Sequence, residues 1–156
     1  MRNKLVTGIV SLLFGVLILI SLIIPWWNEA LGIFGPAGTF YPLSTPTIPQ
    51  DMPRYLSYIT GILIIVSGIS AIVFGSIMIY KKKSQKSNIG SVIAGIIGIV
   101  ALIVYIIFIY KVSPDLNGHV FYFSSYAGVD YGLQAGFYVE GISSFILFVF
   151  GLVSLS

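Results

Sequence analysis

Long apolar segments separated by short polar ones dominate the pattern along this chain. Four of them run over about residues 5–24, 57–80, 89–110 and 135–155. A helix needs about 20 apolar residues to cross the ~30 Å hydrocarbon core of a bilayer. The pattern therefore predicts an all-α membrane protein, a single domain with four transmembrane helices in an up-down bundle of two hairpins.

Two longer polar segments, residues 25–56 and 111–134, connect the spans on the side opposite the linker at 81–88. Both are rich in aromatic and β-branched residues, which suit a half-buried pleated surface. They predict either a small aromatic cap with some β pairing or an irregular aromatic layer on the lipid headgroups. A short interfacial helix fits at residues 29–34. Trp26 and Trp27 follow the first span, where aromatic residues anchor helix ends at the headgroups.

The distribution of charge predicts the orientation. Only 8% of the residues are charged, against about 25% in soluble domains. Basic residues in short loops favour the cytoplasmic side, so the N-terminus, the linker and the C-terminus are expected there. The six on that side are Arg2, Lys4, Lys81, Lys82, Lys83 and Lys86, against Arg54 and Lys111 on the other.

This asymmetry explains the high pI of about 9.2 without a nucleic-acid partner. All five acidic residues fall on or near the external side. Lys81, Lys82, Lys83 and Lys86 are in addition expected to hold anionic lipid headgroups.

Small residues at helical spacing predict where the spans pack together. Gly61, Gly68 and Gly75 lie seven apart and share one face of the second span. Ala94 and Gly98 lie four apart in the third span, and Gly141 lies in the fourth. In lipid, small residues let two helix backbones come close, and packing then holds the helices.

Glu140 is the one ionisable residue inside a predicted span, about five residues from its outer end, and such residues are functional candidates. The segments 58–62 and 138–142 look alike, which favours a weak parallel repeat that would place Thr60 and Glu140 at equivalent positions. Three interpretations are open. Glu140 is structural and bonds Thr60 or Arg54, or it handles protons or cations, or it binds a metal together with Asp130 or Glu29.

Other chemistry finds little support in the sequence. The chain has no cysteine, which excludes disulfides and thiolate sites, and it has one histidine, His119. It carries no phosphate-binding glycine loop, no GxSxG elbow and no HExxH motif. We therefore expect no catalytic residues, no cofactor and no metal.

Four spans, internal termini, a longer first external loop with Trp26 and Trp27, and Arg54 before the second span resemble the claudin-type tetraspan proteins. The first loop of that family carries a Gly-Leu-Trp motif and a cysteine pair. This chain has neither, so the resemblance covers architecture only and implies no function.

Three hypotheses for function follow. The first is a non-enzymatic membrane protein, either an accessory or scaffolding subunit of a larger complex or a small cell-surface interaction protein. The second is a small oligomeric channel or transporter that uses Glu140. The third is a subunit of a membrane redox or lipid-handling enzyme. The expected partners are membrane lipids and other membrane subunits or further copies of the chain.

The charge pattern makes a direct prediction of topology. Reporter tags at residue 1, near Ser84 and after Ser156 should all report the cytoplasm, and tags near Thr45 or Asn117 should report the outside. Reporter activity or protease protection checks this. A cytoplasmic signal at Thr45 would contradict the orientation.

Overall fold

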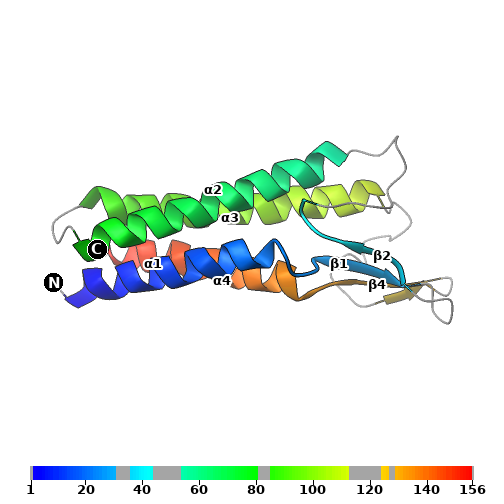
Figure 1. Ribbon diagram of the computed structural model, residues 1–156, viewed down its shortest axis with the longest axis horizontal. Coiled ribbons are helices and arrows are strands. Elements are labelled where there is room, and N and C mark those ends of the chain that lie inside the picture. The colour runs from blue at the N-terminus through cyan, green and yellow to red at the C-terminus, as the bar shows by residue number, and fades with distance from the viewer. Residues whose placement is uncertain are drawn as a thin grey trace.

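The computed structural model describes residues 2–30, 36–43, 54–80, 85–112, 124–126 and 129–155. Within these residues the chain forms the helices α1 (Arg2–Ser21), α2 (Arg54–Tyr80), α3 (Gln85–Val112) and α4 (Ala135–Val153). Figure 1 shows them side by side along the long axis, with both chain ends at the same end of the bundle. We call this the terminal end. α1 and α3 each pack against α2 and α4 and lie diagonally across the bundle from one another.

Three of these helices, α2, α3 and α4, are long and apolar enough to cross a membrane. The apolar part of α1, Leu5–Ser21, is shorter. α1 ends three residues before the predicted boundary, because Pro25 disfavours the helical conformation just before it. The chain still turns as far as Ile24, through three tighter backbone hydrogen bonds such as that from Ile24 N–H to Ser21 O at 3.3 Å.

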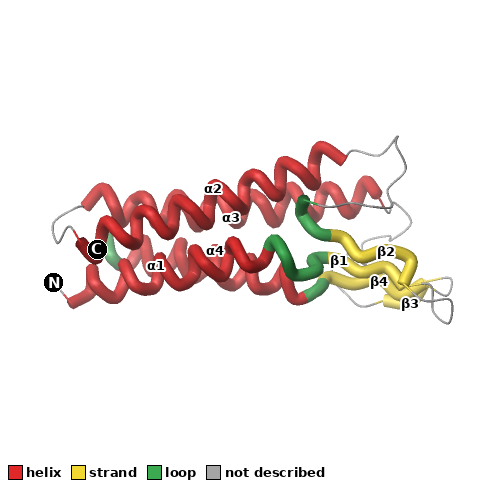
Figure 2. Tube along the Cα trace, viewed as in Figure 1, coloured by secondary structure: helices red, strands yellow, loops and turns green. Residues whose placement is uncertain are grey.

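A four-stranded antiparallel sheet lies at the other end of the bundle, which we call the sheet end (Figure 2). Its strands are β1 (Trp27–Ala30), β2 (Pro36–Phe40), β3 (Ser124–Tyr126) and β4 (Val129–Leu133), in the order β2-β1-β4-β3. The central pair joins the two connecting segments, since β1 comes from the first and β4 from the second. The prediction of a short helix at 29–34 is wrong for the two residues of that range that the structure describes, because Glu29 and Ala30 belong to β1.

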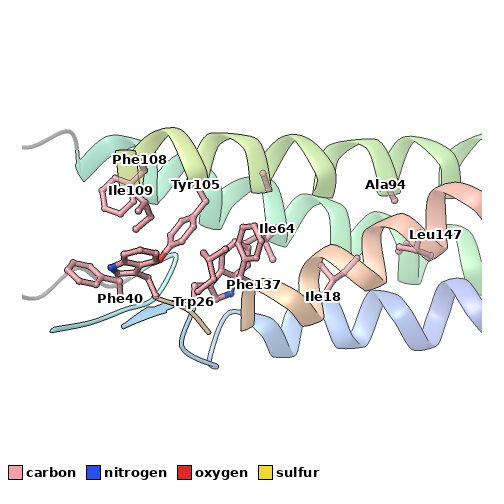
Figure 3. Packing of buried hydrophobic residues seen from close by; sticks show 14 residues of the cluster. Ile18, Trp26, Phe40, Ile64, Ala94, Tyr105, Phe108, Ile109, Phe137 and Leu147 are labelled. Carbon is pink, nitrogen blue, oxygen red and sulfur yellow. The ribbon is translucent and has the colours of Figure 1, made fainter. Parts of the chain in front are cut away.

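Buried aromatic side chains fill the space between the sheet and the helices (Figure 3). The ring of Trp26 lies edge-on to Tyr105 at 4.9 Å and to Phe137 at 5.7 Å between centroids. Such edge-to-face pairs add about 0.5–1.5 kcal/mol each beyond area burial. Trp26 and Trp27 were expected to anchor at the headgroups, but their side chains are 0% and 1% exposed. The strand that follows folds back over the bundle, so both indoles contact protein instead of lipid.

Backbone hydrogen bonds fix this junction. Trp26 N–H donates to Phe40 O at 3.0 Å, and Gln134 N–H donates to Trp26 O at 2.9 Å. Gly136 N–H donates to Pro25 O at 2.9 Å. A Cβ atom on Gly136 would lie 2.8 Å from that same carbonyl oxygen, so only glycine allows this approach. The sheet is thereby tied to the ends of α1 and α4.

Glycines bring α1 and α2 into backbone contact at two levels. A Cβ on Gly75 would lie 2.8 Å from Gly8 O, and a Cβ on Gly15 would lie 2.9 Å from Gly68 O. Gly8 and Gly15 lie seven apart on α1, as Gly68 and Gly75 do on α2. The two helices therefore meet through matched small faces, which suits association in lipid.

The other small residues of the predicted packing faces are placed as follows. Gly61 is buried against Pro42 and Leu43, the segment after β2, rather than against a helix. Ala94 is 0% exposed, and its carbonyl accepts a hydrogen bond from Ser67 Oγ at 2.8 Å. Gly98 faces α4. Gly141 is only partly buried, and a Cβ there would make an ordinary contact at 3.4 Å.

Polar side chains also join the helices inside the bundle. Ser11 Oγ and Ser91 Oγ lie 2.8 Å apart and connect α1 to α3. Near the terminal end, Asn88 Nδ2 donates to Ser154 O at 2.7 Å and joins the start of α3 to the end of α4. Hydrogen bonds of this kind supplement packing between helices in an apolar medium.

The glycine contact predicts the effect of enlarging one residue. Gly75→Leu should destabilise the protein by about 1–3 kcal/mol or more, because backbone atoms of Gly8 and Leu12 cannot move aside. Ile69→Leu, at a side chain that is 51% exposed, should have little effect. Thermal unfolding in detergent measures both. Equal tolerance of the two changes would show that α1 and α2 do not pack through this face.

Candidate functional site

Glu140 lies in the second turn of α4, close to the sheet end, and its side chain is 0% exposed. α4 packs against α1 and α3. Taking a carboxyl group out of water is costly unless hydrogen bonds replace its hydration. The contacts of the two carboxyl oxygens therefore decide how the protein tolerates Glu140.

Two serine hydroxyl groups meet the carboxyl group. Ser144 Oγ, one turn further along α4, donates to Glu140 Oε1 at 2.8 Å. Ser21 Oγ, from the last residue of α1, lies 3.3 Å from Glu140 Oε2. The same Ser21 hydroxyl donates to Ile18 O at 2.7 Å, a common bond for a serine in a helical turn. Glu140 thus joins α1 and α4 through hydroxyl groups.

Gly98 of α3 closes a third side of this site. A Cβ atom there would lie 2.7 Å from Glu140 Oε1 and would collide with Ser144 Oγ. The space that glycine leaves is therefore the space that the carboxyl group and its serine partner occupy. The small residue predicted for helix packing also makes room for a polar group.

The Trp26 side chain connects this site to the sheet. Its Nε1–H donates to Ser21 O at 2.8 Å, so one residue contacts Glu140 through its hydroxyl and Trp26 through its carbonyl. Trp26 packs in turn on Tyr105 and Phe137 (Figure 3). These buried rings belong to the cluster between the sheet and the helices.

One of the two partners that the sequence suggested for Glu140, Thr60, bonds within its own helix. The Thr60 hydroxyl is buried in α2 and donates to Leu56 O at 2.9 Å. Arg54 is the first residue of α2, which packs mainly against α1 and α3. The hydrogen bonds seen at Glu140 come from Ser144 and Ser21 instead. Lys81, Lys82 and Lys83 lie outside the described residues, and Lys86 lies in the first turn of α3.

Sequence reasoning did not find Ser21 or Ser144 as the partners of Glu140. Ser144 could have been found from spacing, since residues four apart on a helix lie on one face. Ser21 had a weaker signal, namely that a polar residue at the end of a span tends to face the bundle. Only the packing of α1 against α4 brings it to the carboxyl group.

Oxygen atoms make up the polar part of this site. Carboxyl and hydroxyl oxygens can bind a proton or a hard cation. Among the residues that the structure describes, no three His, Cys, Asp or Glu side chains gather in a way that could hold a metal ion. Glu140 and the two serines thus form a small cluster of oxygen atoms inside the bundle.

Comparisons with family models, curated proteins and solved structures give no match for this chain. No role comes to it from a relative. What the protein does is therefore inferred from the sheet and from the buried carboxyl group.

The contacts of Gly98 predict a difference between two glycines. Gly98→Ala should destabilise the protein by about 1–3 kcal/mol, because the new methyl group displaces Ser144 Oγ or Glu140 Oε1. Gly141→Ala on the facing helix should be neutral, or stabilising by up to about 1 kcal/mol, since alanine costs less backbone entropy in a helix.

Thermal unfolding of both variants in detergent checks this prediction. A Gly98→Ala protein as stable as the Gly141→Ala protein would show that α3 does not confine the carboxyl group.

Proposed function

We propose that this chain is a multi-pass protein of the cell membrane that acts by holding a partner at its external face. Its role is that of an accessory or scaffolding subunit of a larger membrane complex, or of a small cell-surface interaction protein. All four helices cross the membrane in an up-down arrangement, with both termini and the linker in the cytoplasm. The observation that carries the proposal is the sheet shared by the two connecting segments.

The sheet has the construction of a fixed platform. Its central strands come from different halves of the chain, and the Trp26 backbone ties it to the helices through Phe40 and Gln134. Both connecting segments contribute strands to one sheet, although shorter segments without a sheet would be enough to join the four helices. A fixed external surface is useful for recognition.

The strand order provides a mode of binding. β2 and β3 are the edge strands, each paired on one side within the described residues. The free side of an edge strand presents backbone N–H and C=O groups that can pair with another strand. Strand addition is a general way in which sheets bind extended peptides.

Membrane insertion rests on composition and length. Three helices suffice in length and hydropathy to span a bilayer, and their outer faces carry isoleucine, valine and aromatic side chains. The asymmetry of basic residues favours internal termini. The sheet then lies outside, next to α1 and α4.

Single-cysteine cross-linking tests the proposal, since the natural chain has no cysteine. Two variants place a cysteine on an edge strand, Thr39→Cys on β2 and Ser125→Cys on β3. Each is labelled with a maleimide–benzophenone cross-linker in native membranes. Asn28→Cys on the central strand β1 is the matched control. An edge position should cross-link to a defined membrane protein or to a second copy, and the control should not.

Native size in mild detergent accompanies the cross-linking. A stable complex larger than the single chain supports the partner-holding role, and mass spectrometry of the cross-linked band identifies the partner. A monomer in detergent combined with no cross-link from either edge position would contradict the proposal.

A second candidate is a small oligomeric channel or transporter that uses Glu140. The observation that favours it is the full burial of this carboxyl group inside a helix apolar enough to span the membrane. Such residues often mark ion or proton pathways. Reconstitution in liposomes with a pH-sensitive dye, comparing the natural protein with Glu140→Gln, separates this candidate from the first.

A further inference from the structure

The exposed side chains of α2 change in kind along its length. In the middle of the helix they are all isoleucine or valine, namely Ile59, Ile62, Val66, Ile69 and Val73. Beyond this aliphatic stretch the exposed residues are tyrosines, Tyr55 and Tyr58 at the sheet end and Tyr80 at the terminal end. Tyr58 and Tyr80 are 22 residues apart, which is about 33 Å along a helix and close to the ~30 Å hydrocarbon core of a bilayer.

The helices α3 and α4 show the same order at the sheet end. The exposed residues of α3 from Ile89 to Ile107 are all isoleucine or valine, and Tyr110 and Lys111 follow them. On α4, Tyr138 is the first large exposed side chain, and the exposed ones after it are aliphatic or phenylalanine. The described part of α1 exposes only aliphatic side chains. Exposed tyrosines of the described helices therefore lie only near helix ends.

A contact between α2 and α3 shows how the two helices are aligned in height. Ser67 Oγ donates to Ala94 O at 2.8 Å. Towards the sheet end, Tyr55 lies 12 residues from Ser67 on α2, and Tyr105 lies 11 residues from Ala94 on α3. Because both helices rise about 1.5 Å per residue, the two tyrosines lie at nearly the same height. Tyr58 is less than one turn deeper.

The aromatic cluster extends this level to α4. The ring of buried Tyr105 lies 6.4 Å from that of Phe137, whose chain neighbour is the exposed Tyr138. Trp26 packs on both buried rings at the same level (Figure 3). The tryptophan that the sequence predicted as a headgroup anchor thus lies at the centre of this level, and exposed tyrosines lie on the lipid-accessible faces of α2 and α4.

Tyrosine is suited to the boundary between hydrocarbon and headgroups. Its ring packs among acyl chains, while its hydroxyl group needs a hydrogen-bond partner that the hydrocarbon core does not provide. For this reason tyrosine is enriched at both surfaces of a membrane. The aliphatic residues between the tyrosines of α2 have no such requirement and suit the core itself.

We infer that Tyr55, Tyr58 and Tyr138 form a lipid-binding surface, the tyrosine band, which marks where the hydrocarbon core ends at the sheet end. Their hydroxyl groups donate to the ester and phosphate oxygens of phospholipids. Tyr80 marks the opposite boundary. The inference rests on the membrane insertion proposed above, and it does not depend on a protein partner.

The tyrosine band also sets the depth of nearby groups. Tyr110 lies five residues beyond Tyr105, about 7.5 Å further out, so Tyr110 and Lys111 lie among the headgroups. There the Lys111 ammonium group can bind a lipid phosphate. Glu140, two residues after Tyr138, lies about 3 Å inside the boundary.

Spin labelling measures these depths, since the natural chain has no cysteine. The single variants Tyr58→Cys, Tyr80→Cys, Tyr138→Cys and Ile69→Cys carry a nitroxide in vesicles of phosphatidylcholine and phosphatidylglycerol. Collision with oxygen and with a water-soluble nickel chelate reports the depth of each label. Ile69 lies midway between Tyr58 and Tyr80, so its label should lie at the bilayer centre. The other three should each lie about 15 Å from the centre, half of the core thickness.

The possible outcomes separate this inference from the proposed insertion. A label at Tyr58 or Tyr138 that lies deep in the core, or wholly in water, would overturn the tyrosine band while a deep Ile69 label upholds insertion. A water-accessible Ile69 label would overturn both. Labels shielded from both reagents would show that a second copy covers this face, and would also overturn the band. Tyr55→Cys, close to Tyr58 on the same helix, replaces Tyr58→Cys if that variant fails to fold.

A second experiment tests whether the tyrosines hold the protein at this depth. Changing Tyr55, Tyr58 and Tyr138 together to leucine extends the aliphatic surface by about one helical turn, ~5.4 Å. A label at Ile142→Cys should then move deeper by about 2–5 Å, within that limit. The matched control changes Ile62, Val66 and Ile69 together to leucine, and the label should not move. An unchanged depth in the tyrosine variant would overturn the anchoring role.

Discussion

Helices in lipid gain little from the hydrophobic effect when they associate, because the surrounding chains are as apolar as their own side chains. Close backbone packing must hold them instead, and glycine permits the closest approach. Gly8 and Gly15 against Gly75 and Gly68 supply that contact between α1 and α2. Gly95 supplies it between α3 and α4, where a Cβ atom would lie 2.6 Å from Phe148 N. The positions of α1 and α4, and with them the contact between Ser21 and Glu140, depend on this packing.

The sheet forms without the support of disulfides, since the chain has no cysteine. The two connecting segments have too little apolar surface to fold alone, so they use the end of the bundle as their core. Trp26 is central to this arrangement. It packs on Tyr105 and Phe137, and its Nε1–H satisfies the carbonyl of Ser21 at the end of α1. The bundle and the sheet are thus built on shared residues.

The sequence allowed much of the helical structure to be predicted, because apolar runs of about 20 residues have few alternatives. The predicted starts of α2 and α3 were each late by three or four residues, since polar first turns carry no apolar signal. The sheet was one of two open alternatives, because pairing between β1 and β4 depends on contacts far apart in sequence.

The candidate site was predicted only in part. Glu140 was identified because a charge inside an apolar run is rare, but its partners were not. Whether a residue at its depth meets Ser21, Thr60 or Arg54 depends on how the helices rotate about their axes. Small-residue spacing indicates which faces pack, but it does not specify which helix meets which. The burial of Trp26 and Trp27 could not be read from position, because a span-end tryptophan suits a lipid interface equally well.

The pairing of β1 with β4 has a consequence for the order of events during synthesis. A two-stranded hairpin such as β1–β2 is marginally stable on its own. Its second partner, β4, immediately precedes the last helix, so the sheet stays incomplete until α2 and α3 have been synthesised. Trp27 pairs with Leu133, near the far end of the chain. The sheet end of the molecule is therefore assembled last, and a chain that lacks its final helix would leave the first hairpin open for pairing with other proteins.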